Sequence, residues 1–311
     1  MSRTPVGLIG CGRWGRLILR DLVALGTAVH VVVPTTRDAS DLVHLGAASV
    51  SLDPATMPRV EGVVVATPTS MHADSIELVL PLGVPIFVEK PFTDDPDSAH
   101  SLAERAGDRV FVMDKWRYHA GVGALRDVAS DGRLGRVTEL VTVRTQNGHP
   151  HTDVDCSWIL LPHDLSIAME VMGAYPRPTA AVARQRDGTL YRLDIEFEFS
   201  SGATMRSTVG IDNHVSERRV SVVGSRATAI LASGWDEQIT VTPAVVDAAR
   251  PQPFDIGPTT IAAVGELPLL AELRVFVEHL RGGPAPRSSA WEGAMAVEII
   301  AEVRLMAGLD G

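Results

Sequence analysis

The sequence predicts an α/β protein with two domains: a doubly wound parallel sheet, followed by an α+β domain whose open sheet is mainly antiparallel. The length of 311 residues corresponds to about two domains of ordinary size. Up to Tyr118, short apolar runs alternate with helical patterns, and parallel strands need such crossover helices. After Tyr118, several segments alternate polar and apolar residues with period two, which is typical of an antiparallel sheet. We therefore predict domains at residues 1–118 and 119–311.

In the first domain, the predicted strands are β-branched apolar runs that stop at glycine, threonine or proline. The predicted helices have apolar residues at helical spacing, and the last of them starts next to the acidic residues 94–97. The strands are residues 6–10, 28–33, 60–66, 85–88 and 110–113, and the helices are residues 16–25, 40–45, 72–82 and 97–106.

In the second domain, five strands follow the period-two pattern, and one helix is predicted between the first and the second of them. The chain then finishes with two helical patterns separated by a Gly-Gly-Pro-Ala-Pro loop. The strands are residues 136–145, 191–199, 203–210, 216–223 and 228–231, and the helices are residues 121–130, 160–172, 267–281 and 290–307.

Composition and charge exclude several classes of function. The chain is 45% hydrophobic and 21% charged, and no segment approaches the ~20 apolar residues of a membrane helix. The net charge of −10 argues against nonspecific binding to nucleic acid or to a membrane surface. Cys11 and Cys156 cannot form a disulfide framework, and the first residues lack the pattern of a signal peptide. We expect a cytoplasmic protein.

A glycine-rich turn joins the first strand to the first helix. Gly10-Cys11-Gly12-Arg13-Trp14-Gly15 has the G-x-G-x-x-G spacing of a Rossmann dinucleotide-binding turn. Its glycines allow a tight turn, close approach of a pyrophosphate and packing of the helix on the strand, and the helix N-terminus attracts the anion. The alternative is a glycine-rich turn that binds no ligand.

The end of the second strand bears on the choice of cofactor. An acidic residue there binds the ribose 2′-hydroxyl of NAD and repels the 2′-phosphate of NADP. Here the strand is followed by Thr35, Thr36 and Arg37, whose hydroxyls and guanidinium can donate hydrogen bonds to phosphate oxygens. This pattern favours NADP(H) over NAD(H). The alternative is that Asp38 binds the ribose and the cofactor is NAD.

Further short motifs occur in order along the chain, and with the glycine turn they resemble the Gfo/Idh/MocA family of oxidoreductases, named for glucose-fructose oxidoreductase and inositol dehydrogenase. The resemblance runs nearly from end to end. These motifs are Ala66-Thr67-Pro68-Thr69 with His72, Glu89-Lys90-Pro91, Gly132-Arg133-Leu134-Gly135-Arg136, Leu161-Pro162-His163-Asp164-Leu165 and Val222-Val223-Gly224-Ser225-Arg226.

The resemblance implies that Lys90 is the catalytic lysine. Its position independently agrees, because ligands of doubly wound sheets bind at the carboxyl ends of the strands. An ammonium there can hydrogen-bond the substrate oxygen and share in proton transfer. The alternative is a surface lysine before a turn. The resemblance also implies that Thr67, Pro68 and Thr69 approach the nicotinamide ribose. Glu89, Lys90 and His72 are expected beside the cofactor, and the alternative for His72 is a residue that caps or packs the next helix.

The resemblance implies that His163 contacts the substrate and exchanges a proton with its hydroxyl or carbonyl, for which an imidazole pKa near 6.5 is suitable. Many members carry an aspartate four residues earlier, but this chain has Ile159 there. Asp164, Asp153 or Asp155 are candidates to orient the site in its place. The alternative is a structural histidine.

Substrate contacts are expected at the junction of the domains. Trp116 and Tyr118 could stack on a sugar ring, and the alternative for both is core or interface packing. Arg117 could bind an anionic group, and Lys115 adds charge. Asp155 is a further candidate. His149 and His151, with Asp153, fit no metal signature, and no metal is expected.

Together these features predict an NADP-dependent oxidoreductase that transfers a hydride between nicotinamide and a hydroxyl or keto carbon of a sugar-like small molecule. A nucleotide-sugar ketoreductase is preferred. The alternatives are a free sugar or polyol dehydrogenase, a C=N reductase, or a dinucleotide-binding sensor or scaffold without turnover. Because an exposed apolar sheet face favours association, we expect a homodimer or homotetramer formed through the second sheet.

Overall fold

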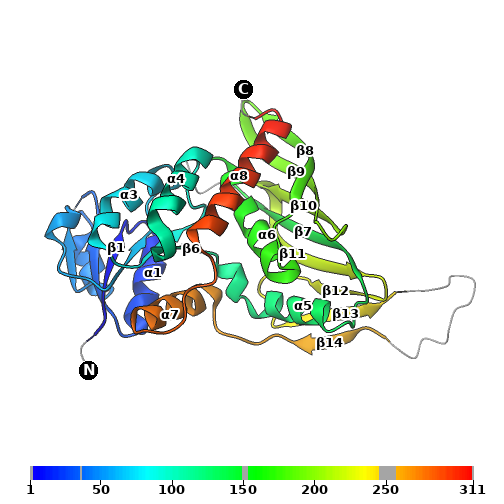
Figure 1. Ribbon diagram of the computed structural model, residues 1–311, viewed down its shortest axis with the longest axis horizontal. Helices are drawn as coiled ribbons and strands as arrows, with labels where there is room; N and C mark the ends of the chain where they lie inside the picture. Colours follow the sequence, from blue (N-terminus) through cyan, green and yellow to red (C-terminus); the bar gives the residue numbers. More distant parts are fainter. Residues whose placement is uncertain (1–2, 36, 149–152, 245–256, 310–311) are drawn as a thin grey trace, which may run out of the picture. The chain divides into compact units, whose positions relative to one another are not determined.

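The computed structural model describes residues 3–35, 37–148, 153–244 and 257–309. The chain divides into two compact units. The first unit contains Met1–Lys115 and Leu267–Glu298, and the second contains Trp116–Glu266 and Ile299–Gly311. Each unit has its own sheet, and the predicted fold class is confirmed (Figure 1).

The first unit is built on six parallel strands in the order β3-β2-β1-β4-β5-β6. The chain starts in the middle of the sheet and builds outward on both sides of β1, so the switch point lies between β1 and β4. Ligands of such sheets bind outside the carboxyl ends of the strands at this point. The strands are β1 (Pro5–Ile9), β2 (Ala28–Val32), β3 (Ser49–Ser51), β4 (Gly62–Val65), β5 (Ile86–Glu89) and β6 (Val110–Met113).

Five helices lie wholly in the first unit: α1 (Arg13–Ala24), α2 (Ala39–His44), α3 (His72–Val79), α4 (Pro96–Ala106) and α7 (Pro268–Leu280). The last helix, α8 (Ala290–Met306), runs from the first unit into the second.

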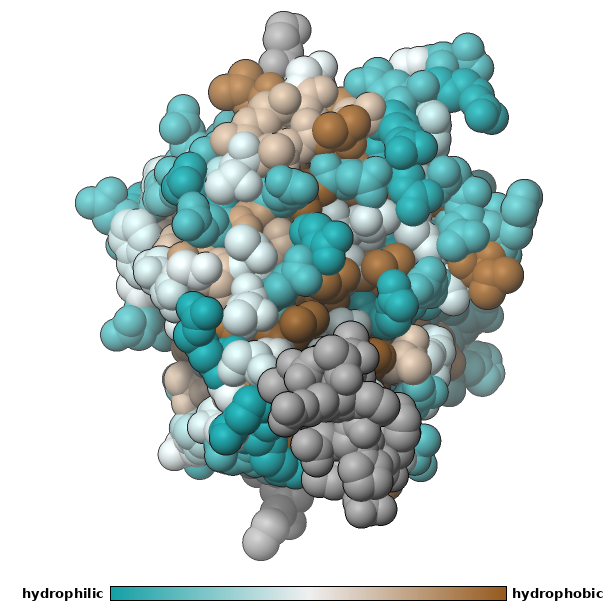
Figure 2. All heavy atoms as spheres, turned by 90° about the vertical axis from the view of Figure 1, so that its right-hand side faces the viewer, coloured by the Kyte–Doolittle hydropathy of each residue, from teal (hydrophilic) through white to brown (hydrophobic). Residues whose placement is uncertain are grey.

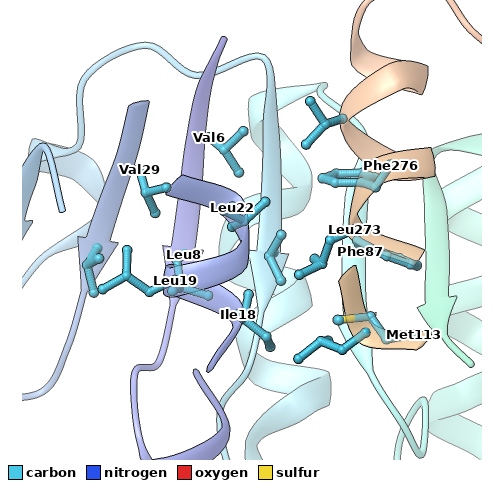
Figure 3. Close-up of a cluster of buried hydrophobic side chains, with 14 of the residues drawn as sticks. Val6, Leu8, Ile18, Leu19, Leu22, Val29, Phe87, Met113, Leu273 and Phe276 are labelled. Carbon is cyan, nitrogen blue, oxygen red and sulfur yellow. The ribbon is translucent and has the colours of Figure 1, made fainter. Parts of the chain in front are cut away.

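Helix α7 completes the core of the first unit although it comes late in the sequence. Leu273 and Phe276 of α7 are fully buried in the same cluster as Ile18 and Leu22 of α1 (Figure 3). The ring of Phe276 stacks on Phe87 of β5, with 5.0 Å between the ring centroids. The structure therefore assigns residues 267–298 to the first unit, whereas the sequence predicted the whole of 119–311 as one domain. The sequence shows that one face of α7 is apolar, but it does not show which of the two sheets this face packs against.

The second unit is built on an eight-stranded sheet in the order β14-β13-β12-β11-β7-β10-β9-β8. All neighbours are antiparallel except β7 and β10. Helices α5 (Ala120–Ser130) and α6 (Cys156–Met172) pack against it. The strands are β7 (Val137–Asn147), β8 (Arg177–Arg186), β9 (Thr189–Glu198), β10 (Thr204–Gly210), β11 (Asp212–Gly224), β12 (Ala227–Leu231), β13 (Gln238–Pro243) and β14 (Thr259–Ala262).

Strands β8, β13 and β14 were not predicted. Most residues of β8 and β14 are exposed or half-buried, because they lie at the two edges of the sheet. Edge strands do not need an alternating apolar face, so the sequence lacks the period-two signal there.

Cross-strand ion pairs occur on exposed parts of the second sheet. Arg206 of β10 contacts Glu139 of β7 at 2.6 Å, and Arg192 contacts Asp212 at 3.6 Å. Polar and apolar residues are interspersed on the side of the molecule shown in Figure 2. In the part of the chain that the structure describes, no helix is long and apolar enough to cross a membrane.

Candidate active site

The glycine turn after β1 has the geometry of a phosphate cradle. Gly10 has a φ of +84°, and a Cβ there would lie 2.7 Å from the carbonyl oxygen of Ala66. A Cβ at Gly15 would lie 2.8 Å from the carbonyl oxygen of Gly10, which explains the close packing of α1 on the strand. At Gly12, in contrast, a Cβ would meet no atom within 4 Å, so the backbone is open to a ligand.

Helix α1 begins at Arg13, directly after this opening, and its N-cap residue Gly12 makes no side-chain capping bond. Its first turn contains no acidic residue, so nothing there opposes an anion. The residues therefore fit a dinucleotide pyrophosphate. Burial raises the pKa of the Cys11 thiol to about 11, so Cys11 is a neutral side chain at physiological pH and not a nucleophile.

Two arginines and one carboxylate are found near the end of β2. Thr35 and Arg37 are exposed, and Asp38 forms an ion pair with Arg16 of α1 at 3.4 Å. Thr36 lies outside the described residues. Arg16 was not among the predicted site residues, because its position in the sequence does not indicate that it contacts the loop after β2.

Glu89, Lys90 and Lys115 form a charged cluster with Trp14 at the carboxyl ends of β5 and β6. The indole Nε1 of Trp14 donates a hydrogen bond to Glu89 Oε1, and the backbone N–H of Lys90 donates to Glu89 Oε2 at 3.2 Å. The Nζ of Lys115 lies 4.3 Å from the centroid of the Trp14 ring, a cation–π contact. The glycine turn and the Glu-Lys-Pro turn are thus joined through Trp14, a role that the sequence did not predict.

Lysine is rare in this chain. Of its 28 Lys and Arg residues, only Lys90 and Lys115 are lysines, and both act electrostatically on Glu89. Arginine stays charged in proteins, whereas an ammonium can lose its proton and is a compact hydrogen-bond donor. A lysine ammonium at these two positions can donate a hydrogen bond to a ligand oxygen.

A second carboxyl group, that of Glu272 in α7, is buried beside this cluster. Its side chain is fully buried, and its Oε2 has no hydrogen-bond partner among the described residues. Burial raises the pKa of Glu272 well above its usual value, and the neighbouring charges of Glu89 and Asp114 raise it further, against the effect of Lys115. Burial also raises the pKa of Glu89, while Lys90 and Lys115 oppose this shift. The sequence signal for Glu272 was an acid on the apolar face of a helix.

Replacing Glu272 with glutamine is expected to flatten the dependence of stability on pH. The folded protein keeps a proton that the unfolded chain releases near pH 4.3, so stability is lost as the pH rises from that value to the raised pKa. Between pH 5 and pH 8, the free energy of unfolding of the parent protein should fall by about 1 kcal/mol or more beyond any change in the variant. Urea unfolding at both pH values measures this. The control is Glu278→Gln, a substitution at an exposed position of the same helix. If the free energy of unfolding changed equally with pH in the parent protein and both variants, the prediction would be contradicted.

His72 connects the turns after β4 and β5. Its ring is buried, with Nδ1 2.8 Å from the carbonyl oxygen of Pro91 and Nε2 3.1 Å from that of Thr67. The Lys90–Pro91 peptide bond is cis. Thr67 Oγ1 lies 3.1 Å from Ser75 Oγ, and Thr69 is buried. The geometry gives His72 a structural role in fixing these turns, where the sequence predicted a cofactor contact.

In the second unit, Asp164 organises the region around His163 on α6. Its carboxylate is fully buried and accepts hydrogen bonds from Thr142 at 3.0 Å and Ser207 at 2.7 Å, and from Arg144 Nε at 2.9 Å. Asp164 therefore fixes α6 against β7 and β10. All of these contacts go to the sheet, which makes Asp164 a structural partner of the site.

Trp116 lies in the middle of this region and is buried. The guanidinium of Arg144 lies 4.4 Å from the centroid of the Trp116 ring. The ring of His119 stacks on it at 4.9 Å, and the ring of His163 meets it edge-on at 6.4 Å. Trp116 and His163 are thus brought together within one unit.

Two of the predicted substrate contacts, Arg117 and Asp155, bind other side chains or the backbone within the second unit. Arg117 forms an ion pair with Glu170 of α6 at 3.5 Å, and Tyr118 is half-buried. Asp155 caps α6 by accepting from the backbone N–H of Ser157 at 2.9 Å, and it also accepts from Arg304. The carboxylate of Asp155 is therefore occupied in holding α6 and α8 together.

Lys90 belongs to the first unit and His163 to the second. Ile159 is buried on α6. Within the described residues no group of three or more His, Cys, Asp or Glu side chains could hold a metal ion, and His149 and His151 lie outside those residues.

Comparison with known proteins agrees with this geometry. Residues 4–113 match the family model described as "Oxidoreductase family, NAD-binding Rossmann fold". The UDP-N-acetylglucosamine 3-dehydrogenase of Acidithiobacillus ferrooxidans is 28% identical over 187 residues, which is 58% of this chain and 58% of that relative. The inositol 2-dehydrogenase of Streptomyces avermitilis is 24% identical, with coverage of 97% and 91% respectively.

Solved structures show the same fold. A levoglucosan dehydrogenase in complex with NADH and L-sorbose superimposes with a TM-score of 0.85 at 16% identity, covering 99% of this chain and 97% of the other. The A. ferrooxidans UDP-N-acetylglucosamine 3-dehydrogenase gives a TM-score of 0.81 at 20% identity and covers both chains completely.

A parallel sheet with an open glycine cradle defines a dinucleotide-binding Rossmann fold, in agreement with the description of the matching family model. Over residues 4–113 the chain is similar to the Gfo/Idh/MocA oxidoreductases, and the inositol 2-dehydrogenase of S. avermitilis extends the similarity to nearly the whole chain.

Proposed function

We propose that this protein transfers a hydride between C4 of a nicotinamide and a hydroxyl- or keto-bearing carbon of a sugar or polyol. The observation that carries the proposal is the pairing of the open backbone at Gly12 with Lys90 at the same edge of the sheet. The names of the relatives, a UDP-N-acetylglucosamine 3-dehydrogenase and inositol 2-dehydrogenases, support a substrate of this class.

In this proposal the glycine turn and the N-terminus of α1 would hold the pyrophosphate of the cofactor, whose nicotinamide would supply the hydride chemistry. For oxidation, Lys90 donates a hydrogen bond to the substrate oxygen and stabilises negative charge on it. His163 accepts the hydroxyl proton as the carbon loses its hydride, and the alcohol becomes a carbonyl. In reduction, His163 returns the proton to the oxygen.

For the cofactor we propose NADP(H), because Arg16 and Arg37 outnumber Asp38 at the end of β2. NADPH is expected to bind at least tenfold more tightly than NADH, a difference of about 1.4 kcal/mol. Fluorescence titration with each nucleotide measures the two dissociation constants. Arg37→Ser should reduce the preference, whereas the control Arg20→Ser, an exposed arginine on α1, should not. Tighter binding of NADH would instead assign Asp38 to the ribose.

For the substrate we propose a nucleotide-linked sugar, with a free polyol as the alternative. Initial rates with UDP-N-acetylglucosamine and with myo-inositol, each with NADP⁺ and NAD⁺, distinguish the two. Ile159 in place of an aspartate favours one further candidate, a dinucleotide-binding sensor. Cofactor binding without reduction or oxidation of any substrate in a broad sugar panel would support the sensor.

A further inference from the structure

Two arginines face each other on the helix-covered side of the second sheet. On β7, alternate residues on this side are Leu140, Thr142 and Arg144, and the first two are fully buried. On β11 the corresponding residues are Val222, Val220 and Arg218, and the strand register pairs Leu140 with Val222, Thr142 with Val220 and Arg144 with Arg218. The first two of these cross-strand pairs are uncharged, whereas the third pair consists of two guanidinium groups.

Only one of these two charges is neutralised. Arg144 pairs with the buried Asp164 at 2.9 Å. Arg218 is half-buried and has no hydrogen bond or ion pair within the described residues. Burial, followed by the charge of Arg144, lowers the pKa of Arg218. Like charges directly opposite each other destabilise a sheet, so the folded chain carries a repulsion here that a bound anion would remove.

An unused hydrogen-bond donor lies beside the two arginines. Trp116 is only 5% exposed, and its indole Nε1 has no acceptor in the described part of the chain. A Cβ at Gly234 would lie 2.6 Å from Trp116 Cη2 and 3.3 Å from Arg218 Cβ, so Gly234 is packed between the tryptophan ring and Arg218. The same ring contacts Arg144 and His163. A bound oxyanion would neutralise the charge of Arg218 and accept a hydrogen bond from Trp116 Nε1.

We propose that Arg218, together with Arg144 and Trp116, binds an anionic group of the substrate, a carboxylate or a phosphate. This inference rests on the proposed function and narrows it: the enzyme acts on an acidic or phosphorylated sugar and not on a neutral polyol. Guanidinium groups bind both anions through paired hydrogen bonds. Because Trp116 contacts His163, the anionic group lies near the histidine that exchanges the proton. Arg117, the anion-binding candidate from the sequence, is paired with Glu170 and leaves this role to Arg218.

Three sugars that differ in charge test the proposal: glucose, glucuronate and glucose 6-phosphate. Binding to the cofactor-loaded protein is measured by calorimetry, and turnover by the change in nicotinamide absorbance. We expect at least one anionic sugar to bind ten times more tightly than glucose, and the comparison of glucuronate with glucose 6-phosphate identifies the anion. Arg218→Gln should remove this advantage without changing the affinity for glucose, and Arg218→Lys should restore part of it.

Arg219→Gln is the matched control. Arg219 is the next residue on β11, points to the opposite side of the sheet and pairs with Glu217 at 3.5 Å. This variant should bind the anionic sugar like the parent protein. Melting temperatures separate binding from a structural role: without ligand, Arg218→Gln should melt at or above the parent temperature because a repulsion is removed. The anionic sugar should raise the melting temperature of the parent protein only.

Several outcomes would overturn the inference. Equal affinity of the parent protein for all three sugars, equal losses in Arg218→Gln and Arg219→Gln, or a lower melting temperature of ligand-free Arg218→Gln would each do so. Turnover of glucose but not of the anionic sugars would leave the proposed function standing and remove the anion site. Arg218-dependent binding of an anionic sugar without any hydride transfer would keep the anion site and contradict the proposed function.

Discussion

Replacing Lys90 with methionine is expected to lower kcat about a thousandfold while changing the dissociation constant of the nicotinamide cofactor less than twofold. Loss of one hydrogen-bond donor that stabilises negative charge on the reacting oxygen lowers kcat roughly 10²–10³-fold. The cofactor, in contrast, is held mainly by the glycine turn and the start of α1. Steady-state kinetics with the best substrate of the sugar panel measures kcat, and a fluorescence titration with the reduced cofactor measures its dissociation constant.

Lys90→Arg separates charge from hydrogen-bond geometry. Arginine keeps the positive charge but replaces a compact ammonium with a planar guanidinium, so we expect this variant to retain substrate affinity and remain impaired in kcat. Arg105→Met, which removes an exposed cation of α4 paired with Glu77, is the control and should be fully active. Unchanged turnover in Lys90→Met would remove Lys90 from the mechanism.

Replacing Asp164 with alanine is expected to destabilise the protein by about 3–5 kcal/mol. The substitution leaves Arg144 as a buried charge without its partner and deprives Thr142 and Ser207 of their acceptor. Urea unfolding followed by tryptophan fluorescence and by circular dichroism measures the loss.

Two further proteins test the cause of this loss. Asp127→Ala removes an exposed partner of Arg126 and should cost less than about 1 kcal/mol. The double variant Asp164→Leu with Arg144→Met replaces the buried pair with apolar side chains and should recover much of the stability. A loss for Asp164→Ala no larger than that for Asp127→Ala would show that the buried network does not stabilise the second unit.

Local patterns in the sequence were sufficient for most of the fold. The helix after the glycine turn, the alternating strands around residues 191–231 and the two last helices were predicted within a few residues of their bounds. The glycine turn and the Glu-Lys-Pro motif also identified the carboxyl ends of the parallel strands in the first unit as the place of the predicted site. Such signals depend on a few adjacent residues, through the period of apolar side chains and the backbone freedom of glycine.

The partners of individual side chains could not be predicted in this way. The sequence placed Asp155 and His72 among the ligand contacts, whereas the structure has Asp155 capping α6 and His72 bridging two turns. The sequence also predicted that Arg117 binds an anionic group of the substrate, whereas in the structure Arg117 forms an ion pair with Glu170. A charged residue looks the same in a sequence whether its partner is a ligand or another side chain.

The sequence by itself determined the class of the fold, the position of the dinucleotide cradle and the lysine at the edge of the sheet. Only the tertiary structure decided that α7 completes the first core, that Glu272 lies beside Glu89, and that Arg218 faces Arg144 without an acid of its own. Secondary structure follows from residues that are close in the chain, but burial and charge pairing depend on which distant segments pack together.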